Sequence, residues 1–177
     1  MVQFLRPVSD EAIGGWTDEC GGTTNIRNSI DEVCRCDSDF IITGNNPSCD
    51  VYRAEITVGT DPLGNVCHIA RYAYGKDAGA RVGQILVALL QGSSCVIHEE
   101  THDAVAAGFT AGTFTLTSCE ADSITSYAQL QVRITANTSG GGSPQQGQVS
   151  WFELEIPGDA PTGGRVFRKP INASGMI

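Results

Sequence analysis

The stretch 128–136, with the sequence AQLQVRITA, decides the fold class of this chain. Its apolar side chains occupy every second position, and Gln129, Gln131, Arg133 and Thr135 occupy the positions between them. Alternation with a period of two is typical of a β-strand that has one face in the core and one face in solvent. We therefore expect β-structure around this stretch, with a core face and a wet face.

Further segments on both sides of this strand have strand-like patterns. Residues 82–90 are apolar on both faces, which is typical of a buried central strand or a short helix, and Gly83 favours the strand. Turn-forming sequences separate the runs, most clearly at residues 61–65 and 74–79, and the glycine-rich stretch 138–147 forms a long loop. The other predicted strands are residues 40–43, 52–58, 66–74, 113–117 and 152–156.

About eight short strands separated by turns predict an all-β fold, a two-sheet antiparallel β-sandwich of jelly-roll type. Residues 37–157 are expected to form the sandwich. Residues 1–36 have weak periodicity and are expected to be an extended N-terminal segment that packs on it. Residues 158–177 are expected to be a C-terminal arm.

Composition excludes several classes of function. The chain has 177 residues, of which 41% are apolar and 18% charged, so it is long and apolar enough for one domain with a real core. Its net charge of −9 disfavours nucleic acid as a partner, because that affinity comes from lysine and arginine. We find neither an apolar run that would span a membrane nor a secretory signal, so we expect synthesis in a host cytoplasm.

The seven cysteines are an odd number, so at least one has no internal disulfide partner. In a reducing cytoplasm we expect them to be mostly reduced core residues, while release of a particle from the cell would allow some to oxidise. Cys34 and Cys36, with Cys20 and Cys49, are a candidate zinc set. Their spacing does not match the paired knuckles of zinc ribbons, so scattered thiols are favoured.

Residues 98–102, His-Glu-Glu-Thr-His, match the HExxH string of zinc hydrolases. In such sites a helix places His98 and His102 on one face, where both bind zinc, and Glu99 activates a zinc-bound water. The β-branched residues before His98 favour a strand, in which these positions would lie ~13 Å apart. Glu100 also stands where those enzymes have an apolar residue. Residues 98–108 remain compatible with a helix, but a polar loop or strand edge is favoured.

A zinc hydrolase would also need a third metal ligand. The metzincin pattern would place glycine at 105 and histidine at 108, where this chain has Val105 and Gly108. Glu120 is an alternative, in a sequence that looks like a turn. We therefore expect no catalytic residue, no metal and no cofactor, with His98 and His102 as the candidate metal ligands if this expectation is wrong.

The aromatic residues suggest a different activity. Trp16, Trp151, Tyr72 and Tyr74 could together form a platform on which sugar rings stack, although aromatic residues on sandwich strands more often belong to a core or an interface.

The C-terminal stretch 158–177 is a basic tail on an acidic chain, with three basic residues and one acid, Asp159. It is expected either to be a disordered terminus or to be an arm that lies on a neighbouring subunit. Apolar residues within it favour the arm. The candidate partner-binding residues are Arg165, Phe167, Arg168, Lys169 and Ile171.

The order of these segments resembles that of small jelly-roll virion proteins of tailed bacteriophages, of the head-decoration or fibre type. The resemblance covers most of residues 4–157. It is carried by residues 4–7 (FLRP), Trp16, residues 29–32 (SIDE), 37–41 (DSDFI), 54–56 (AEI), 130–132 (LQV) and 149–157 (VSWFELEIP).

The resemblance implies a non-enzymatic structural role in a virion. It implies a capsid decoration or cement protein that binds the major capsid protein or another virion protein and forms a homo-oligomer, with a trimer as one candidate. Similar folds occur in carbohydrate-binding modules, so the alternative is a glycan-binding jelly-roll module of a phage fibre. A zinc hydrolase acting through residues 98–102 is the third hypothesis.

Overall fold

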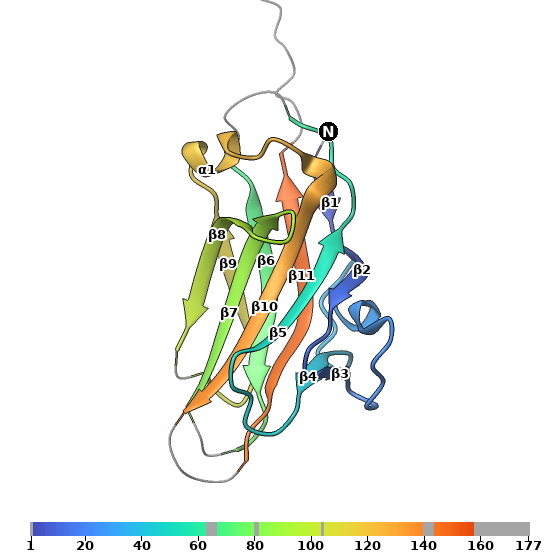
Figure 1. The fold of residues 1–177 in the computed structure, drawn as a ribbon, viewed down its shortest axis with the longest axis vertical. Helices are drawn as coiled ribbons and strands as arrows, with labels where there is room; N and C mark the ends of the chain where they lie inside the picture. Colours follow the sequence, from blue (N-terminus) through green and yellow to red (C-terminus); the bar gives the residue numbers. More distant parts are fainter. Residues whose placement is uncertain (1, 63–66, 80–81, 104, 140–143, 158–177) are drawn as a thin grey trace, which may run out of the picture.

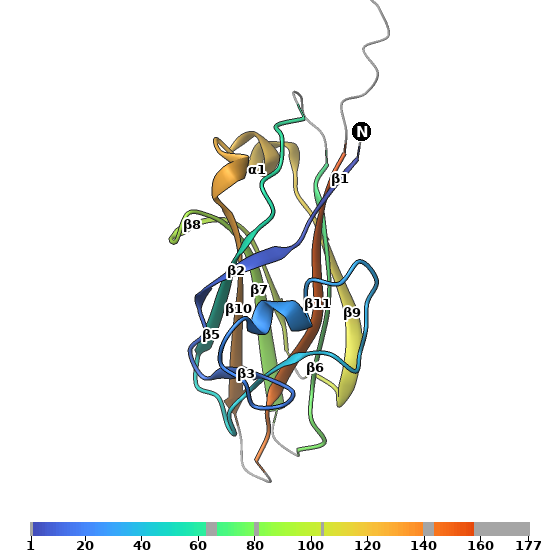
Figure 2. The ribbon, with the colours of Figure 1, turned by 90° about the vertical axis from the view of Figure 1, so that its right-hand side faces the viewer.

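The chain folds into two antiparallel β-sheets packed face to face. A computed structural model describes residues 2–62, 67–79, 82–103, 105–139 and 144–157. Over these residues sheet A has six strands in the order β3-β4-β11-β6-β9, with β1 also paired to β11, and sheet B has five in the order β2-β5-β10-β7-β8. The predicted two-sheet antiparallel β-sandwich is confirmed. Figure 2 shows it edge-on, with β5, β10 and β7 in one layer and β11, β6 and β9 in the other.

Over the described residues the elements are a series of strands with three short helices. The strands of sheet A are β1 (Gln3–Leu5), β3 (Trp16–Asp18), β4 (Ile41–Thr43), β6 (Ile69–Lys76), β9 (Gly108–Thr115) and β11 (Gly147–Ile156). Those of sheet B are β2 (Pro7–Ala12), β5 (Asp50–Ile56), β7 (Val82–Gln91), β8 (Cys95–His102) and β10 (Leu130–Ser139). The helices are η1 (Ile26–Ser29), α1 (Ser118–Asp122) and η2 (Tyr127–Gln129).

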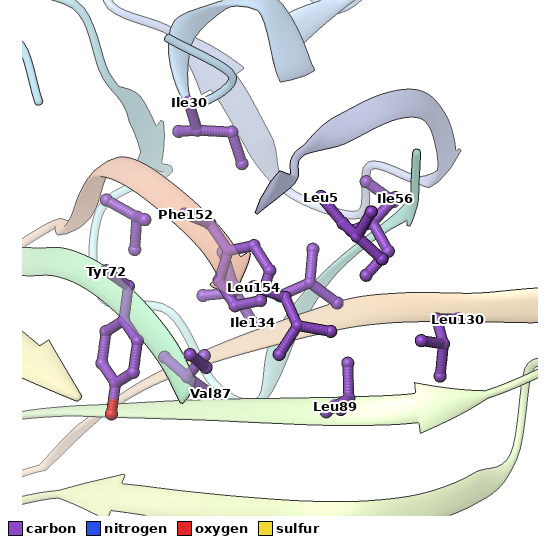
Figure 3. Close-up of a cluster of buried hydrophobic side chains, with 14 of the residues drawn as sticks. Leu5, Ile30, Ile56, Tyr72, Val87, Leu89, Leu130, Ile134, Phe152 and Leu154 are labelled. Carbon is purple, nitrogen blue, oxygen red and sulfur yellow. The ribbon is translucent and has the colours of Figure 1, made fainter. Parts of the chain in front are cut away.

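Strand β10, predicted from the alternation in residues 128–136, has one face in the core, as that pattern requires. β10 is central in sheet B, paired with β5 on one side and with β7 on the other. Leu130 and Ile134 point inward and are buried with Phe152 and Leu154 of the opposite sheet (Figure 3). The apolar run at 82–90 is strand β7 rather than a helix.

The N-terminal boundary differs from the sequence-based division. Residues 1–36 were expected to be an extended segment outside a sandwich that starts at residue 37, but β1, β2 and β3 pair within both sheets, so the sandwich begins at Gln3. These strands are short and partly polar, and they depend on partners far along the chain, so local periodicity does not reveal them. The segment between β3 and β4 does pack on the sandwich, since the Trp151 indole donates to the Glu32 carbonyl.

No helix in the part of the chain that the structure describes is long and apolar enough to cross a membrane.

Candidate functional site

The HExxH string lies on an edge strand and not on a helix. Strand β8 carries His98, Glu100 and His102 on the side that faces sheet A, and Glu99 and Thr101 on the outer side. The geometry that a zinc hydrolase needs is therefore not present, because histidines four apart on a strand lie ~13 Å from each other. Among the described residues, no group of three His, Cys, Asp or Glu side chains is placed to hold one metal ion.

The two histidines instead pack between the two sheets, on the side of the sandwich where β8 and β9 are the edge strands. The His98 ring stacks on Phe114 of β9, with ring centroids 4.5 Å apart, and the His102 ring stacks on Tyr74 of β6 at 3.9 Å. Nε2 of His102 lies 2.7 Å from the hydroxyl of Tyr72, which is buried. Burial is the main cause that lowers the pKa of His102 and raises that of Tyr72.

Glu120 is the carboxylate partner of His98 and lies in helix α1. The sequence suggested a turn here, but Thr117 and Glu120 form a reciprocal capping box that starts a short helix. Nδ1 of His98 lies 2.8 Å from Oε1 of Glu120. The hydrogen bond with His98, followed by that with the Thr117 backbone, lowers the pKa of Glu120 to about 2. The ring contacts and hydrogen bonds of His98 and His102 thus join β8 to β6, β9 and α1, although Nε2 of His98 has no hydrogen-bond partner.

The aromatic residues do not form a sugar-stacking platform. Trp16 and Tyr72 are buried in the core, and Tyr74 is packed between Tyr72 and His102. Trp151 lies on the other face of sheet A, half-buried under the segment that accepts its indole hydrogen bond. The alternative of a platform built from these four residues is wrong, because Trp16, Tyr72 and Tyr74 pack inside the sandwich while Trp151 lies on the outer face of sheet A.

The cysteines are also placed differently from expectation. All seven are free, and six are exposed while Cys36 is half-buried, so they are not the small core residues that the sequence suggested. The candidate partner-binding residues of the C-terminal tail, Arg165, Phe167, Arg168, Lys169 and Ile171, lie outside the described residues.

The outer face of sheet B is the surface best suited to a ligand. Figure 1 shows β5, β10, β7 and β8 side by side in the foreground, with no other segment across the middle of this face. Alternation places Arg53 of β5 beside Arg133 of β10, and Glu55 beside Gln131, with their side chains on the outer side. The inward neighbours, among them Ala54 and Val132, belong to the core.

Polar atoms on this face have unused hydrogen-bonding capacity. Arg133 pairs with Glu99 of β8 across Ala88, with 2.5 Å between Nη2 and Oε2. This pair leaves Nε of Arg133 buried without a partner, and the same holds for Nε of Arg53 and Oε1 of Gln131. Gln131 is only 7% exposed. Buried polar atoms without partners are rare in folded proteins. Three of the nine found among the described residues lie together on this face, which makes it the candidate ligand surface.

Apolar side chains accompany the polar ones. Ala88 and Leu90 are buried on the outer side of sheet B, separate from the main core cluster. Leu86 and Val96 lie beside them, half-buried and exposed respectively. The sequence alone assigns no role to Arg53, Gln131 and Arg133. The signal was present in the strongly alternating strands, whose polar positions define the outer face.

Comparisons with known proteins give limited information. No protein-family model matches the chain, and no curated protein matches it. Among solved structures, the chain is similar to the xylan-binding module CBM15 over 90% of this chain and 99% of that one, with 10% identity and a TM-score of 0.44. It is also similar to TmCBM61 in complex with beta-1,4-galactotriose, over 86% of both chains, with 8% identity and a TM-score of 0.36.

A third similar structure contains the CBM22-1 and GH10 modules of the Clostridium thermocellum endo-1,4-beta-D-xylanase 10B with xylohexaose. The match covers 92% of this chain and 30% of that one, with 12% identity and a TM-score of 0.41. At such identities and TM-scores no ligand is transferred from these proteins to this chain.

Proposed function

We propose that this chain is a non-catalytic saccharide-binding module and that the outer face of sheet B holds the ligand. The observation that carries the proposal is the cluster of three buried polar atoms without partners, on Arg53, Gln131 and Arg133, on a face that no other described segment covers. Sugar hydroxyls both donate and accept hydrogen bonds. A saccharide that displaces the side chains now covering these atoms can therefore pair with the two guanidinium N–H groups and the amide oxygen.

The length of the central strand on this face suits an extended polymer. β10 has ten residues, so the row of outward polar side chains along it is ~33 Å long. Leu86 and Val96 offer apolar contact for the C–H groups of a sugar ring beside these polar groups. No aromatic side chain lies on this face among the described residues, so hydrogen bonds rather than ring stacking would give specificity.

Affinity gel electrophoresis of the full chain tests the proposal, with soluble xylan, β-1,4-galactan, mannan and mixed-linkage β-glucan as probes. We expect at least one polysaccharide to retard the protein. Arg53→Ala should abolish the retardation. Arg71→Ala is the matched control, because Arg71 is a half-exposed arginine on the outer face of sheet A. Equal mobility of the unmodified chain in every gel contradicts the proposal, and so does an equal effect of the two substitutions.

A virion decoration role is the second candidate, favoured by exposed apolar residues at one end of the sandwich. Val2, Phe4 and Val8 are all exposed on or beside the first two strands, and Val58 is exposed after β5. Exposed apolar residues on these strands would suit a protein partner. Co-sedimentation with purified capsids tests this role, with Phe4→Ser expected to reduce occupancy. If the capsids bind neither the unmodified chain nor the Phe4→Ser variant, the decoration role is contradicted.

A further inference from the structure

The outer edges of the two sheets are not protected equally. Sheet B ends at β2 and β8, and sheet A ends at β9 on one side and at β3 and the three-residue β1 on the other. Natural edge strands avoid unwanted pairing by being short or by carrying bulges, prolines or charges. β2 has two register shifts and begins at Pro7, β8 has a register shift and carries Glu99 and Glu100, and β3 has only three residues. Each of these three edges therefore has at least one such protection.

Strand β9 has none of them, although Arg35 and Phe40 of the segment before β4 contact its residue Phe109. Its eight residues, with the sequence GFTAGTFT, include no proline and no charge, and it pairs with β6 without a register shift. A long, regular and uncharged edge is a template for a further strand. This edge is therefore the place in the sandwich where strand addition is physically easiest.

The direction of the free backbone groups can be derived from one hydrogen bond. The N–H of Leu116 donates to the carbonyl of His68, at 2.9 Å, in continuation of the β9–β6 ladder. Because backbone groups alternate in direction along a strand, the even-numbered residues of β9 bond to β6 and the odd-numbered residues point away from it. Phe109 agrees with this, since its carbonyl accepts a hydrogen bond from Arg35 rather than from β6.

Three further residues have outward-pointing backbone groups. Ala111, Thr113 and Thr115 each direct one N–H and one carbonyl away from β6, and within the described ranges no hydrogen bond reaches these groups. They offer up to about six hydrogen bonds to an added strand.

The surface next to this edge is acidic. Glu100 of β8 lies beside His98, which stacks on Phe114 of β9, and Glu120 of α1 bonds to His98. Asp103 follows directly after β8 and is exposed. A strand that adds here is therefore favoured if it is basic.

We propose that residues 165–169 of the same chain, Arg-Val-Phe-Arg-Lys, add to β9 as an antiparallel strand. This five-residue segment carries three positive charges, Val166 and Phe167, and no proline. If it is extended, alternation places Arg165, Phe167 and Lys169 on one side, where the positive charges can meet the acidic surface. The same segment supplied four of the partner-binding residues predicted from the sequence.

The connecting chain is long enough. Ile69 pairs with both Glu155 of β11 and Thr115 of β9, so the end of β11 and the end of β9 lie at the same end of sheet A. A new strand beyond β9 would lie three strand spacings from β11, or ~14 Å. The seven residues 158–164 can span ~23 Å. A chain that enters from this end runs antiparallel to β9.

A second copy of the molecule is a poorer occupant than the chain's own tail. Pairing of β9 with β9 of another copy would bring two acidic surfaces together around a two-fold axis. The tail of another copy would have the right charge but is present only at its solution concentration. A tethered segment that can reach its site has an effective concentration in the millimolar range. At micromolar protein it therefore occupies the site in preference to the tail of a second copy.

Hydrogen–deuterium exchange of the full chain at low micromolar concentration tests the proposal. We expect the amides of residues 165–169 to be protected. Ala111→Pro should make them exchange at least about tenfold faster, since the Ala111 N–H points away from β6 and its loss costs no bond within the sheet. Val166→Pro should speed exchange at Thr113 and Thr115. Ala173→Pro, outside the segment, is the matched control and should change neither region.

Rapid exchange of residues 165–169 in the unmodified chain overturns the proposal, and points to an arm that waits for another partner. Protection that disappears on dilution, together with a dimeric mass by light scattering, also overturns it in favour of the tail of a second copy. If Ala111→Pro does not fold, Val166→Pro still decides, because its substitution lies outside the sandwich. Unchanged exchange at Thr113 and Thr115 in that variant contradicts the proposal.

Discussion

Replacing Tyr72 by phenylalanine removes one hydroxyl group from the place where β6 meets β8. The ring of Tyr72 is buried and would keep its contacts with Tyr74, Phe114 and His102. Only the hydrogen bond to Nε2 of His102, 2.7 Å long, is lost. The substitution therefore isolates the contribution of that bond.

The expected loss of stability can be estimated from the burial of the two partners. Leaving a buried polar atom unpaired costs about 1–3 kcal/mol. His102 is half-buried, so part of its ring can regain water and the cost should lie near the lower limit. We expect a decrease of about 1 kcal/mol in the free energy of unfolding. For a chain of this size that lowers Tm by about 2–4 °C.

Urea unfolding followed by tryptophan fluorescence measures the change, with calorimetry for Tm. Tyr74→Phe is the matched control, because it removes a hydroxyl for which the structure gives no hydrogen bond while keeping the stack on His102. A Tyr72→Phe variant as stable as that control, or more stable, would refute the view that the histidines of β8 serve to close the sandwich.

Three other predictions concern the same region. Gly112→Ala should destabilise the fold by about 1–3 kcal/mol, since its Cβ would lie 2.3 Å from the Tyr72 ring, and unfolding midpoints check this. The free energy of unfolding should fall as pH drops below about 6.5. In this range His102 binds a proton in the unfolded chain but not in the folded chain, because folding lowers its pKa. Unfolding measured at pH 7.5 and 5.5 checks this, and His102→Gln should reduce the difference between the two. Purified protein should contain no stoichiometric zinc by elemental mass spectrometry, and one zinc per chain would show that β8 binds metal after all.

The sequence predicts the sheets best where a strand has one buried face and one solvent-exposed face. The pattern of 128–136 suffices for β10 because its outward residues, such as Arg133, are polar. The run at 82–90 could be read as a strand or a helix because Ala88 and Leu90 are apolar on the outer face of β7. Ala88 is covered by the ion pair of Arg133 and Glu99, and these two residues belong to the neighbouring strands β10 and β8. β2 was missed because its six residues include Ser, Asp and Glu, and its pairing with β5 joins segments more than 40 residues apart.

The candidate site was less predictable than the fold. The string at 98–102 has a clear meaning on a helix, but its real partners, Phe114, Tyr72 and Glu120, come from three other elements. Arg53 and Gln131 become a site only when β5 and β10 are placed side by side. Such contacts depend on register, which local sequence patterns do not fix.

Chemical-shift mapping tests the central claim most directly. The isotope-labelled full chain would be titrated with the oligosaccharide of whichever polysaccharide retards it most, or with xylohexaose if none does. Binding to the outer face of sheet B should shift the side-chain amide of Gln131 and the Nε–H signals of Arg53 and Arg133, while Arg71 on the opposite face stays unchanged. Shifts confined to sheet A or to the β8–β9 side, or no shifts at millimolar sugar, would contradict the claim that this face binds saccharide.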